Sequence, residues 1–126
     1  MELALMKCEA CRPGTPAMSR AEIQKWLKQI DGWDVVERDG METLRKVFSF
    51  RDFAEALGFT NRVGEIAEDQ DHHPELLTEW GRVTVSWWTH AVKGVHRNDL
   101  IMAAKTDEVL DPDVVPDLEE LEEDDD

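Results

Sequence analysis

The sequence predicts an α+β fold: a single domain whose four-stranded antiparallel sheet carries helices packed on one face. The 126 residues suit one domain of ordinary size. Apolar residues switch between the helical and the alternating period in the order α-β-β-α-β-β-α. Two hairpin signals lie between the helices, and antiparallel hairpins separated by helices are typical of this fold class.

The first helix should begin at a capping box, in which Ser19 and Glu22 satisfy free backbone amides at the helix start. Apolar residues then follow with the spacing of one helical face. These residues are Ile23, Trp26, Leu27 and Ile30. Asp31-Gly32 is expected to end the helix.

A hairpin follows, with strands expected over residues 33–38 and 41–50. The two residues between them, Asp39-Gly40, favour a type I′ turn, because both positions of that turn need a positive φ angle.

The longest helix is expected after a second capping box, which runs from Ser49 to Asp52. Its apolar face is wide enough to be well buried on one side. The face consists of Phe53, Ala56, Leu57, Phe59, Thr60, Val63, Gly64, Ile66 and Ala67. Pro74 disfavours the helical conformation at His73, so the helix should end just before the histidines.

A second hairpin is expected over residues 76–80 and 82–89, around Gly81. Its second strand alternates Val83, Val85 and Trp87 with polar or outward positions, as a half-buried strand does. A last helix should cover residues 97–106. Trp33, Trp80 and Trp87 are most simply explained as core residues.

The acidic residues are concentrated at the C-terminal end of the chain. The net charge is −15, but residues 107–126 alone hold 12 acidic and no basic side chains. We expect these residues to form a disordered acidic tail, after an irregular arm over 1–18 and a domain over 19–106. The domain is nearly balanced in charge, which gives no indication of nucleic-acid binding.

The chain shows no sign of a membrane or secretory segment. No apolar run approaches the ~20 residues that span a bilayer. Lys7 and Cys8 interrupt the N-terminal stretch, so a secretory signal is not expected. We therefore expect a cytoplasmic protein in a reducing compartment.

The most informative residues form a histidine cluster with nearby carboxylates. His72 and His73 follow the long helix, and His90 follows the last strand. Imidazole has an unperturbed pKa of about 6.5 and can transfer protons in both directions near neutral pH. The carboxylates Glu68, Asp71 and Asp99 lie close by in the sequence, and Glu68 could share a helix face with His72. The cluster suggests acid–base chemistry.

A metal site is the main alternative. His72, His73, His90, Asp71 and Glu68 could supply ligands, but there is no HExxH motif and adjacent histidines rarely chelate one ion well. Cys8-x-x-Cys11 is half of a zinc site, which a second subunit could complete; free thiols or a disulfide are the other possibilities. We expect no metal.

The histidine region resembles the signature of the pterin-4a-carbinolamine dehydratases. The resemblance rests on Glu68-x-x-x-His72-His73-Pro74, Trp80, Val83-x-Val85, Thr89-His90, Gly94-Val95 and Asp99. It extends upstream through Gly32-Trp33, Phe48 to Phe53 and Phe59-x-x-Arg62-Val63, and covers roughly residues 19–106. The Cys8-x-x-Cys11 arm is similar to one found in many bacterial members.

The resemblance implies an α+β domain that forms homodimers or homotetramers by extending its sheet. It also implies a reaction, the loss of water from a 4a-hydroxytetrahydropterin to give the quinonoid dihydropterin. A pterin would be the small-molecule substrate, and no metal or organic cofactor would be needed.

The resemblance also implies roles for individual residues. His72 and His90 would act as general acids from two sides of the 4a carbon, and His73 would bind or polarise the pterin. The supporting residues would orient the imidazoles, bind substrate or, at Trp33, wall the pocket. They are Glu68, Asp71, Pro74, Thr89, Asp99 and Trp33.

One position departs from the family pattern. His96 stands where the family usually has Ser or Thr, and histidine is a poorer helix N-cap. Asn98 could cap the last helix instead, which would shift Asp99.

Relatives of the same fold also work without catalysis, as dimerisation cofactors of a transcription factor or as assembly factors for the carbon-fixing carboxylase. Such a protein-binding role is the alternative to an enzyme. The complete histidine motif favours the enzyme.

Overall fold

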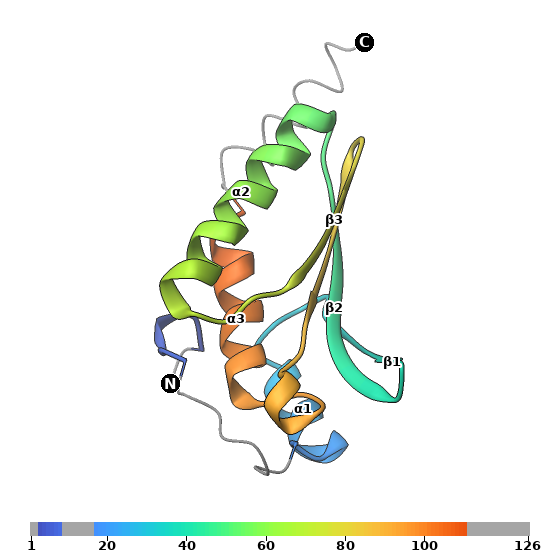
Figure 1. Ribbon diagram of the computed structural model, residues 1–126, viewed down its shortest axis with the longest axis vertical. Coiled ribbons are helices and arrows are strands. Elements are labelled where there is room, and N and C mark those ends of the chain that lie inside the picture. Colours follow the sequence, from blue (N-terminus) through green and yellow to red (C-terminus); the bar gives the residue numbers. More distant parts are fainter. Residues whose placement is uncertain (1–2, 9–16, 111–126) are drawn as a thin grey trace.

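The computed structural model describes residues 3–8 and 17–110, which form one α+β domain (Figure 1). The described elements are η1 (Leu3–Leu5), α1 (Arg20–Leu27), β1 (Asp34–Arg38), β2 (Met41–Ser49), α2 (Phe53–Gln70), β3 (Glu75–Glu79), β4 (Arg82–Trp87), η2 (His90–Val92) and α3 (Arg97–Glu108). The predicted order of helices and strands is confirmed. None of the helices within these ranges is long and apolar enough to cross a membrane.

The four strands form an antiparallel sheet in the order β1-β2-β4-β3. The predicted type I′ turn joins β1 to β2, because Asp39 and Gly40 both have positive φ angles, 53° and 82°. The two hairpins meet along β2 and β4, with Leu44 opposite Trp87 and Phe48 opposite Val83. This register brings the core-facing side chains of the two hairpins together.

Helices α2 and α3 cover one face of the sheet, as predicted (Figure 1). Phe48 from β2 packs between Trp33 and Phe59, with ring centroids 6.0 Å and 4.7 Å away. Helix α3 is buried on nearly all sides, because it contacts the sheet, α2 and the N-terminal turn η1. The site described below lies at the N-terminal end of this buried helix.

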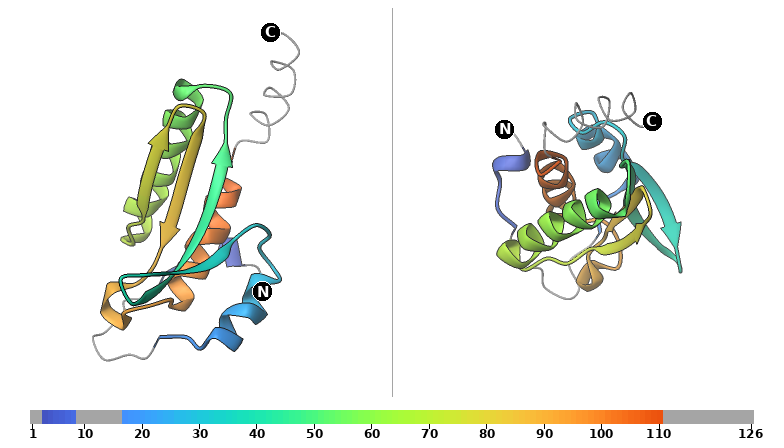
Figure 2. Two further views of the ribbon diagram at one scale, coloured as in Figure 1. Left: turned by 90° about the vertical axis from the view of Figure 1, so that its right-hand side faces the viewer. Right: turned by 90° about the horizontal axis from the view of Figure 1, so that it is seen from above.

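No helix covers the other face of the sheet within the described ranges, as the left view of Figure 2 shows. Val47 and Leu77 are 47% and 54% exposed there. Arg38 at the end of β1 reaches across this face to Glu75 at the start of β3, with Nη2 donating to Oε2 over 2.7 Å. The hydrogen bond from Arg38 lowers the pKa of the Glu75 carboxyl.

Helix α2 starts later than the second capping box predicts. The observed N-cap is Asp52, whose side chain accepts the N–H of Glu55, and Ser49 is the last residue of β2. Ser49 pairs with Arg82 in the sheet, so its backbone is extended and cannot begin the helix.

Other corrections concern strand ends and one tryptophan. The second strand of the second hairpin ends at Trp87, two residues earlier than predicted. Trp80 was predicted to lie in the core but is 73% exposed, because it sits beside Gly81 in the turn between β3 and β4. Trp33 and Trp87 are buried as predicted.

The domain extends beyond residue 106. Helix α3 runs to Glu108, and Asp107 accepts hydrogen bonds from Trp33 Nε1 (3.1 Å) and Lys46 Nζ (2.9 Å). Arg62 donates to the carbonyl of Val109 over 2.9 Å. Asp107 and Val109, which the sequence assigned to the acidic tail, therefore contact the domain; residues 111–126 lie outside the described part.

The described part of the N-terminal arm packs on the domain. Leu3 in η1 is 2% exposed and belongs to the core. The Cys8 backbone N–H donates to Gln70 Oε1 at the end of α2 (2.9 Å), and Cys8 Sγ lies 3.8 Å from the carbonyl of Asn98 in α3. Cys11 lies outside the described residues.

Candidate active site

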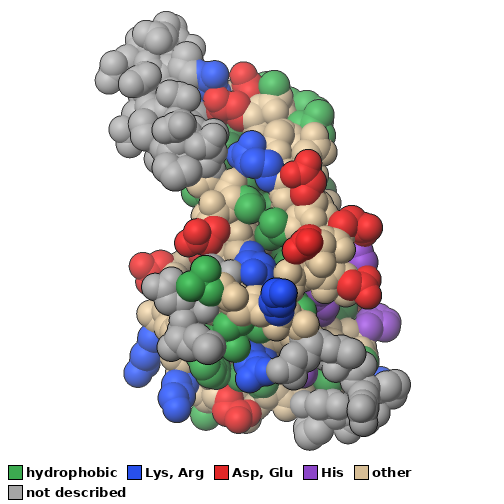
Figure 3. Space-filling view, turned by 90° about the vertical axis from the view of Figure 1, so that its left-hand side faces the viewer, with side chains coloured by type: hydrophobic (Ala, Val, Ile, Leu, Met, Phe, Trp, Pro, Cys, Tyr) green, Lys and Arg blue, Asp and Glu red, His purple; other side chains and the backbone are tan. Residues whose placement is uncertain are grey.

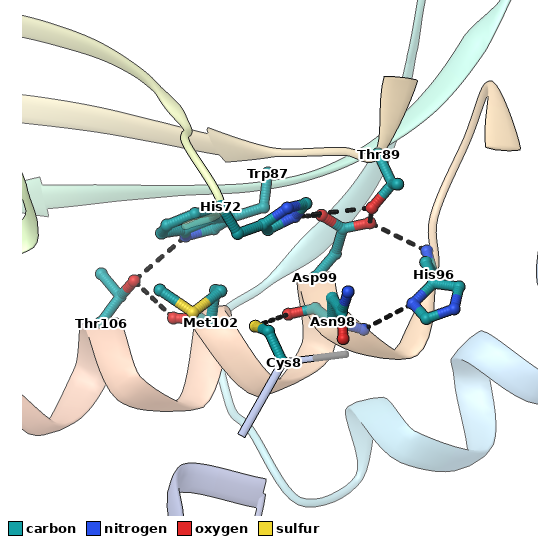
Figure 4. Close-up of polar contacts among 9 residues, drawn as sticks. All are labelled: Cys8, His72, Trp87, Thr89, His96, Asn98, Asp99, Met102 and Thr106. Carbon is teal, nitrogen blue, oxygen red and sulfur yellow. Dashed lines mark hydrogen bonds and ion pairs between the residues drawn. The ribbon is translucent and has the colours of Figure 1, made fainter. Parts of the chain in front are cut away.

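His72 and Asp99 form the best-defined polar pair near the N-terminus of α3. His72 Nε2 lies 2.6 Å from Asp99 Oδ1 (Figure 4). The side chain of His72 is 14% exposed and that of Asp99 is fully buried. Since an ionised carboxylate can only accept hydrogen bonds, the contact assigns a proton to Nε2 of His72 and leaves Nδ1 for exchange.

Asp99 accepts two further hydrogen bonds. Thr89 Oγ1 donates to Oδ2 over 2.7 Å, and the backbone N–H of His96 donates to the same oxygen over 2.8 Å (Figure 4). Three donors from three segments therefore surround one buried carboxylate, which offsets much of the cost of removing it from water. Asp99 ties together the end of α2, the end of β4 and the start of α3.

His96 caps helix α3, and the alternative cap at Asn98 is not used. The Nδ1 atom of His96 accepts the backbone N–H of Asn98 over 3.0 Å, and Asp99 completes a capping box with the His96 backbone. Histidine can serve here because a neutral ring nitrogen is an acceptor, as a serine hydroxyl oxygen would be. The start of α3 is therefore not shifted, and Asp99 occupies the third helical position.

A left-handed residue ends α2 and directs the two adjacent histidines. Asp71 has a φ angle of 53°, and the backbone N–H of His72 turns back to the carbonyl of Ala67 over 3.1 Å. Because of this turn, the His72 side chain does not lie one helical turn beyond Glu68 on the same helix face. Glu68 therefore contacts His73, with Oε2 2.7 Å from Nε2, and not His72 as the four-residue spacing suggested. His73 and Glu68 are exposed.

His90 is held by a short loop after β4. The backbone groups of Thr89 and Gly94 bond to each other in both directions, at 2.8 Å and 3.3 Å, and the turn η2 lies between them. The loop fixes Thr89 beside Asp99 and leaves His90 exposed.

The three imidazoles line one cavity of about 280 Å³, which we call the histidine cavity. Its lining residues are Asp71, His72, His73, Trp88, Thr89 and His90. The end of β4 thus lies beside the C-terminus of α2, which is what a meeting of the three histidines requires. Figure 3, seen from the helix side, shows histidine side chains gathered near one edge of the molecule.

Trp87 supports the cavity from the core. Its indole stacks on the imidazole of His72, with ring centroids 5.7 Å apart and planes 11° from parallel. Trp87 Nε1 donates to Thr106 Oγ1 over 3.0 Å, and Thr106 in turn donates to the carbonyl of Met102 (Figure 4). The stacked ring and the Asp99 carboxylate together restrict the orientation of His72.

Trp33 does not lie where the resemblance implies. Its indole is 4% exposed and is bound to Asp107 near the C-terminal end of α3, whereas the histidine cavity adjoins the N-terminal end. The aromatic wall of the cavity is Trp88 instead. Pro74 is not among the lining residues; it separates the histidines from β3.

The opposite placement of Trp87 and Trp88 could have been found from the sequence. Trp87 and Trp88 are neighbours in a strand-like run, and alternation places them on opposite faces of the sheet. One should then meet the helix-side core and the other the uncovered face. The stacking of Trp87 on His72 has no local signal, because it depends on how α2 ends.

The arrangement offers positioned proton donors and acceptors. His72 has a fixed tautomer, while His73 and His90 reach the same space from two different segments. Such a set can protonate a leaving group and accept a proton elsewhere on one small molecule. Within the described ranges, no three His, Cys, Asp or Glu side chains lie in an arrangement that could hold a metal ion.

Comparison with known protein families gives one match over most of the chain. Residues 16–109 match the family described as pterin 4 alpha carbinolamine dehydratase. A protein of Nitrosococcus oceani, whose name assigns it provisionally as a pterin-4-alpha-carbinolamine dehydratase, is 52% identical over 109 residues. The alignment covers 86% of this chain and 96% of that protein.

Two solved structures share the fold. One, from Brucella melitensis, is described as a transcriptional coactivator/pterin dehydratase; it is 37% identical with a TM-score of 0.67, over 73% of this chain and 96% of that one. The other is a pterin dehydratase-like RuBisCO assembly factor of the alpha-carboxysome; at 18% identity and a TM-score of 0.52, over 63% of this chain and 89% of that one, it supports the fold alone. The match over residues 16–109 and the 52% identical relative show that this chain belongs to the pterin 4 alpha carbinolamine dehydratase family.

Proposed function

We propose that the protein is a hydro-lyase that converts a 4a-hydroxytetrahydropterin to the quinonoid dihydropterin and water. The observation that carries the proposal is the meeting of His72, His73 and His90 around one cavity, in a chain of this family. The catalytic role of these histidines is part of the proposal.

The reaction needs two proton transfers on one small ring. The bond between the 4a carbon and its hydroxyl oxygen breaks, and the oxygen takes up a proton to leave as water. A proton is lost from a ring N–H, and its electron pair forms the new double bond to the 4a carbon. Imidazoles can supply and accept these protons near pH 7.

The proposal gives each histidine a role, and the contacts of His72 and His73 support the roles of these two. His72, with its Nε2–H donated to Asp99, would act as a general acid in its imidazolium form, giving a second proton from Nδ1 to the leaving hydroxyl, and His90 would act from the opposite side of the 4a carbon. His73 would take the ring proton, with Glu68 orienting it through Nε2. Thr89 and Asp99 would position His72 without touching the substrate.

The proposal includes a homodimer or homotetramer in the cytoplasm, and neither a nucleic-acid partner nor a cofactor. Relatives named as a coactivator or an assembly factor make a protein-binding role the alternative. The complete set of three histidines around a cavity favours the enzyme, because a protein-binding surface has no need of it.

A stopped-flow assay tests the proposal. Purified protein is mixed with synthetic 4a-hydroxytetrahydropterin, and the absorbance of the quinonoid product is followed with and without a metal chelator. We expect catalysis well above the buffer rate, unchanged by chelator. A rate equal to that of buffer would refute the activity, and a rate abolished by chelator would refute the metal-free mechanism.

A further inference from the structure

A second cavity adjoins the histidine cavity on the uncovered face of the sheet. This sheet cavity has a volume of about 300 Å³, which lies at the lower end of the ~300–1,000 Å³ typical of ligand pockets. Its lining includes Val36, Arg38, Arg45, Glu75, Thr84 and Ser86.

The two cavities adjoin at two points of the chain. Trp88 lines the histidine cavity, and Ser86, two residues earlier in the same strand-like run, lines the sheet cavity. His73 and Glu75 are likewise two residues apart, one in each lining. Glu75 is the first residue of β3 and Trp87, between Ser86 and Trp88, is the last of β4, so these two strand ends border both cavities.

Arg38 also connects the two cavities. Its guanidinium carbon lies 6.0 Å from the centre of the Trp88 ring, and the same group lines the sheet cavity. A molecule held between the histidines could therefore extend past Trp88 toward Arg38 without leaving the protein surface.

The charges of the sheet cavity favour an anionic group. Arg38 is paired with Glu75, so these two charges largely offset each other. Arg45 is exposed and forms no salt bridge within the described ranges, but its charge acts on Glu75: after the hydrogen bond from Arg38, the positive charge of Arg45 also lowers the pKa of the Glu75 carboxyl. In the sheet register Ser86 lies directly between Arg45 and Glu75, and it is 4% exposed. The cavity thus holds two guanidiniums, Arg38 and Arg45, and one carboxylate, Glu75, so its lining keeps a surplus positive charge next to a hydroxyl at its floor.

We propose that the sheet cavity receives the substituent on carbon 6 of the pterin ring and favours a substituent that ends in a carboxylate, which Arg45 binds. This assignment rests on the proposed dehydratase function. A guanidinium suits a carboxylate because its N–H groups can donate two parallel hydrogen bonds to the two oxygens. Arg45 is then a specificity-determining residue that takes no part in the proton transfers.

The test compares three 4a-hydroxytetrahydropterins that differ only at carbon 6. One carries a methyl group, one a hydroxyalkyl chain, and one a carboxyalkyl chain of the same length. For the unaltered protein we expect kcat/KM to be about 10-fold higher with the carboxyalkyl than with the methyl substrate, as one partly exposed charged contact provides. Arg45→Gln should abolish this preference and leave kcat/KM for the methyl substrate unchanged.

Arg82→Gln is the matched control. Arg82 lies on the same strand pair, outside the sheet cavity, and its removal changes the net charge by the same amount. This variant should keep the preference. Equal kcat/KM for the three substrates, a preference that survives Arg45→Gln, or an equal loss in Arg82→Gln would each overturn the assignment.

A binding measurement separates this inference from the proposed function. Unreactive 7,8-dihydropterins with the same methyl and carboxyalkyl groups are titrated, and tryptophan fluorescence is followed. The dissociation constant of the carboxyalkyl form should be lower in the unaltered protein and should rise in Arg45→Gln. If no substrate is dehydrated, the function is wrong whatever the binding shows; if the methyl substrate is dehydrated but neither test shows a preference, only this inference fails.

Discussion

At the scale of single residues, Asp99 organises the candidate site. Its side chain is fully buried, and it accepts hydrogen bonds from His72 Nε2, Thr89 Oγ1 and the His96 backbone N–H. The resemblance pointed to Asp99 as a supporting residue but not to its partner. The sequence spacing indicated Glu68 for His72, and this was wrong because the left-handed Asp71 turns His72 away from the helix surface.

Replacing Asp99 by Asn should impair catalysis more than folding. The amide keeps the shape but can accept at only one atom, so His72 loses its carboxylate partner and its fixed tautomer. We expect kcat/KM to fall by about 10²-fold, the lower end of the range for general acid–base catalysis. Stopped-flow kinetics and urea unfolding measure the two effects.

The control for this change is Thr89→Val, which removes one donor to Asp99 and leaves the contact between Asp99 and His72. It should lower stability by about 1 kcal/mol, as for one hydrogen bond, with a much smaller effect on kcat/KM. A full rate in Asp99→Asn would contradict the positioning role of the carboxylate.

At the scale of elements, local signals predicted the helices and strands well where capping and turn residues were decisive. The capping box at Ser19 and the turn at Asp39-Gly40 are both present. The end of α3 could not be predicted, because it depends on distant partners: Trp33 and Lys46 bind Asp107, and composition alone had assigned that residue to the acidic tail.

The end of α3 gives a prediction about truncation. A chain ending at Thr106 loses Asp107 and the carbonyl of Val109, and it should be less stable by about 2–4 kcal/mol, as for the loss of two or three hydrogen bonds that involve charged groups. A chain ending at Leu110 should keep the stability and the dehydratase rate of the full chain. Urea unfolding of the three proteins makes the comparison, and equal stability of both truncated chains would contradict it.

The contact between β1 and β3 gives a prediction about pH. The hydrogen bond from Arg38 lowers the pKa of Glu75 in the folded protein below its value in the unfolded chain. The stabilisation is therefore present above the unfolded pKa, about 4.3, and is lost as the pH falls through the lower folded value. The Glu75→Gln variant should unfold at slightly less urea than the parent at pH 7.

This difference should shrink as the pH falls below the unfolded pKa, and it should disappear once the Glu75 carboxyl of the folded parent is protonated. Because the pair is largely exposed, the effect at pH 7 should be small and should shrink further in high salt. A difference that stays constant between pH 7 and pH 3 would show that the Glu75→Gln substitution acts through packing and not through the lost charge.

At the scale of the whole molecule, periodicity predicted the α+β fold and its helix-covered face, and these are confirmed. What the sequence could not show is which aromatic residues meet the histidines. Trp33 was expected at the pocket and lies in the core near the other end of α3, while Trp88 lines the cavity. These outcomes depend on the register between the two hairpins and on the end of α2, for which neighbouring residues give no signal.

The most direct test of the account measures dehydration of the two 4a stereoisomers separately in three proteins: the parent, His73→Ala and His90→Ala. If three imidazoles act from different sides, His73→Ala should lower kcat/KM for both isomers by up to about 10²-fold. His90→Ala should lower it for one isomer far more than for the other. Parent-like rates in both variants, or equal losses for both isomers in His90→Ala, would contradict the account.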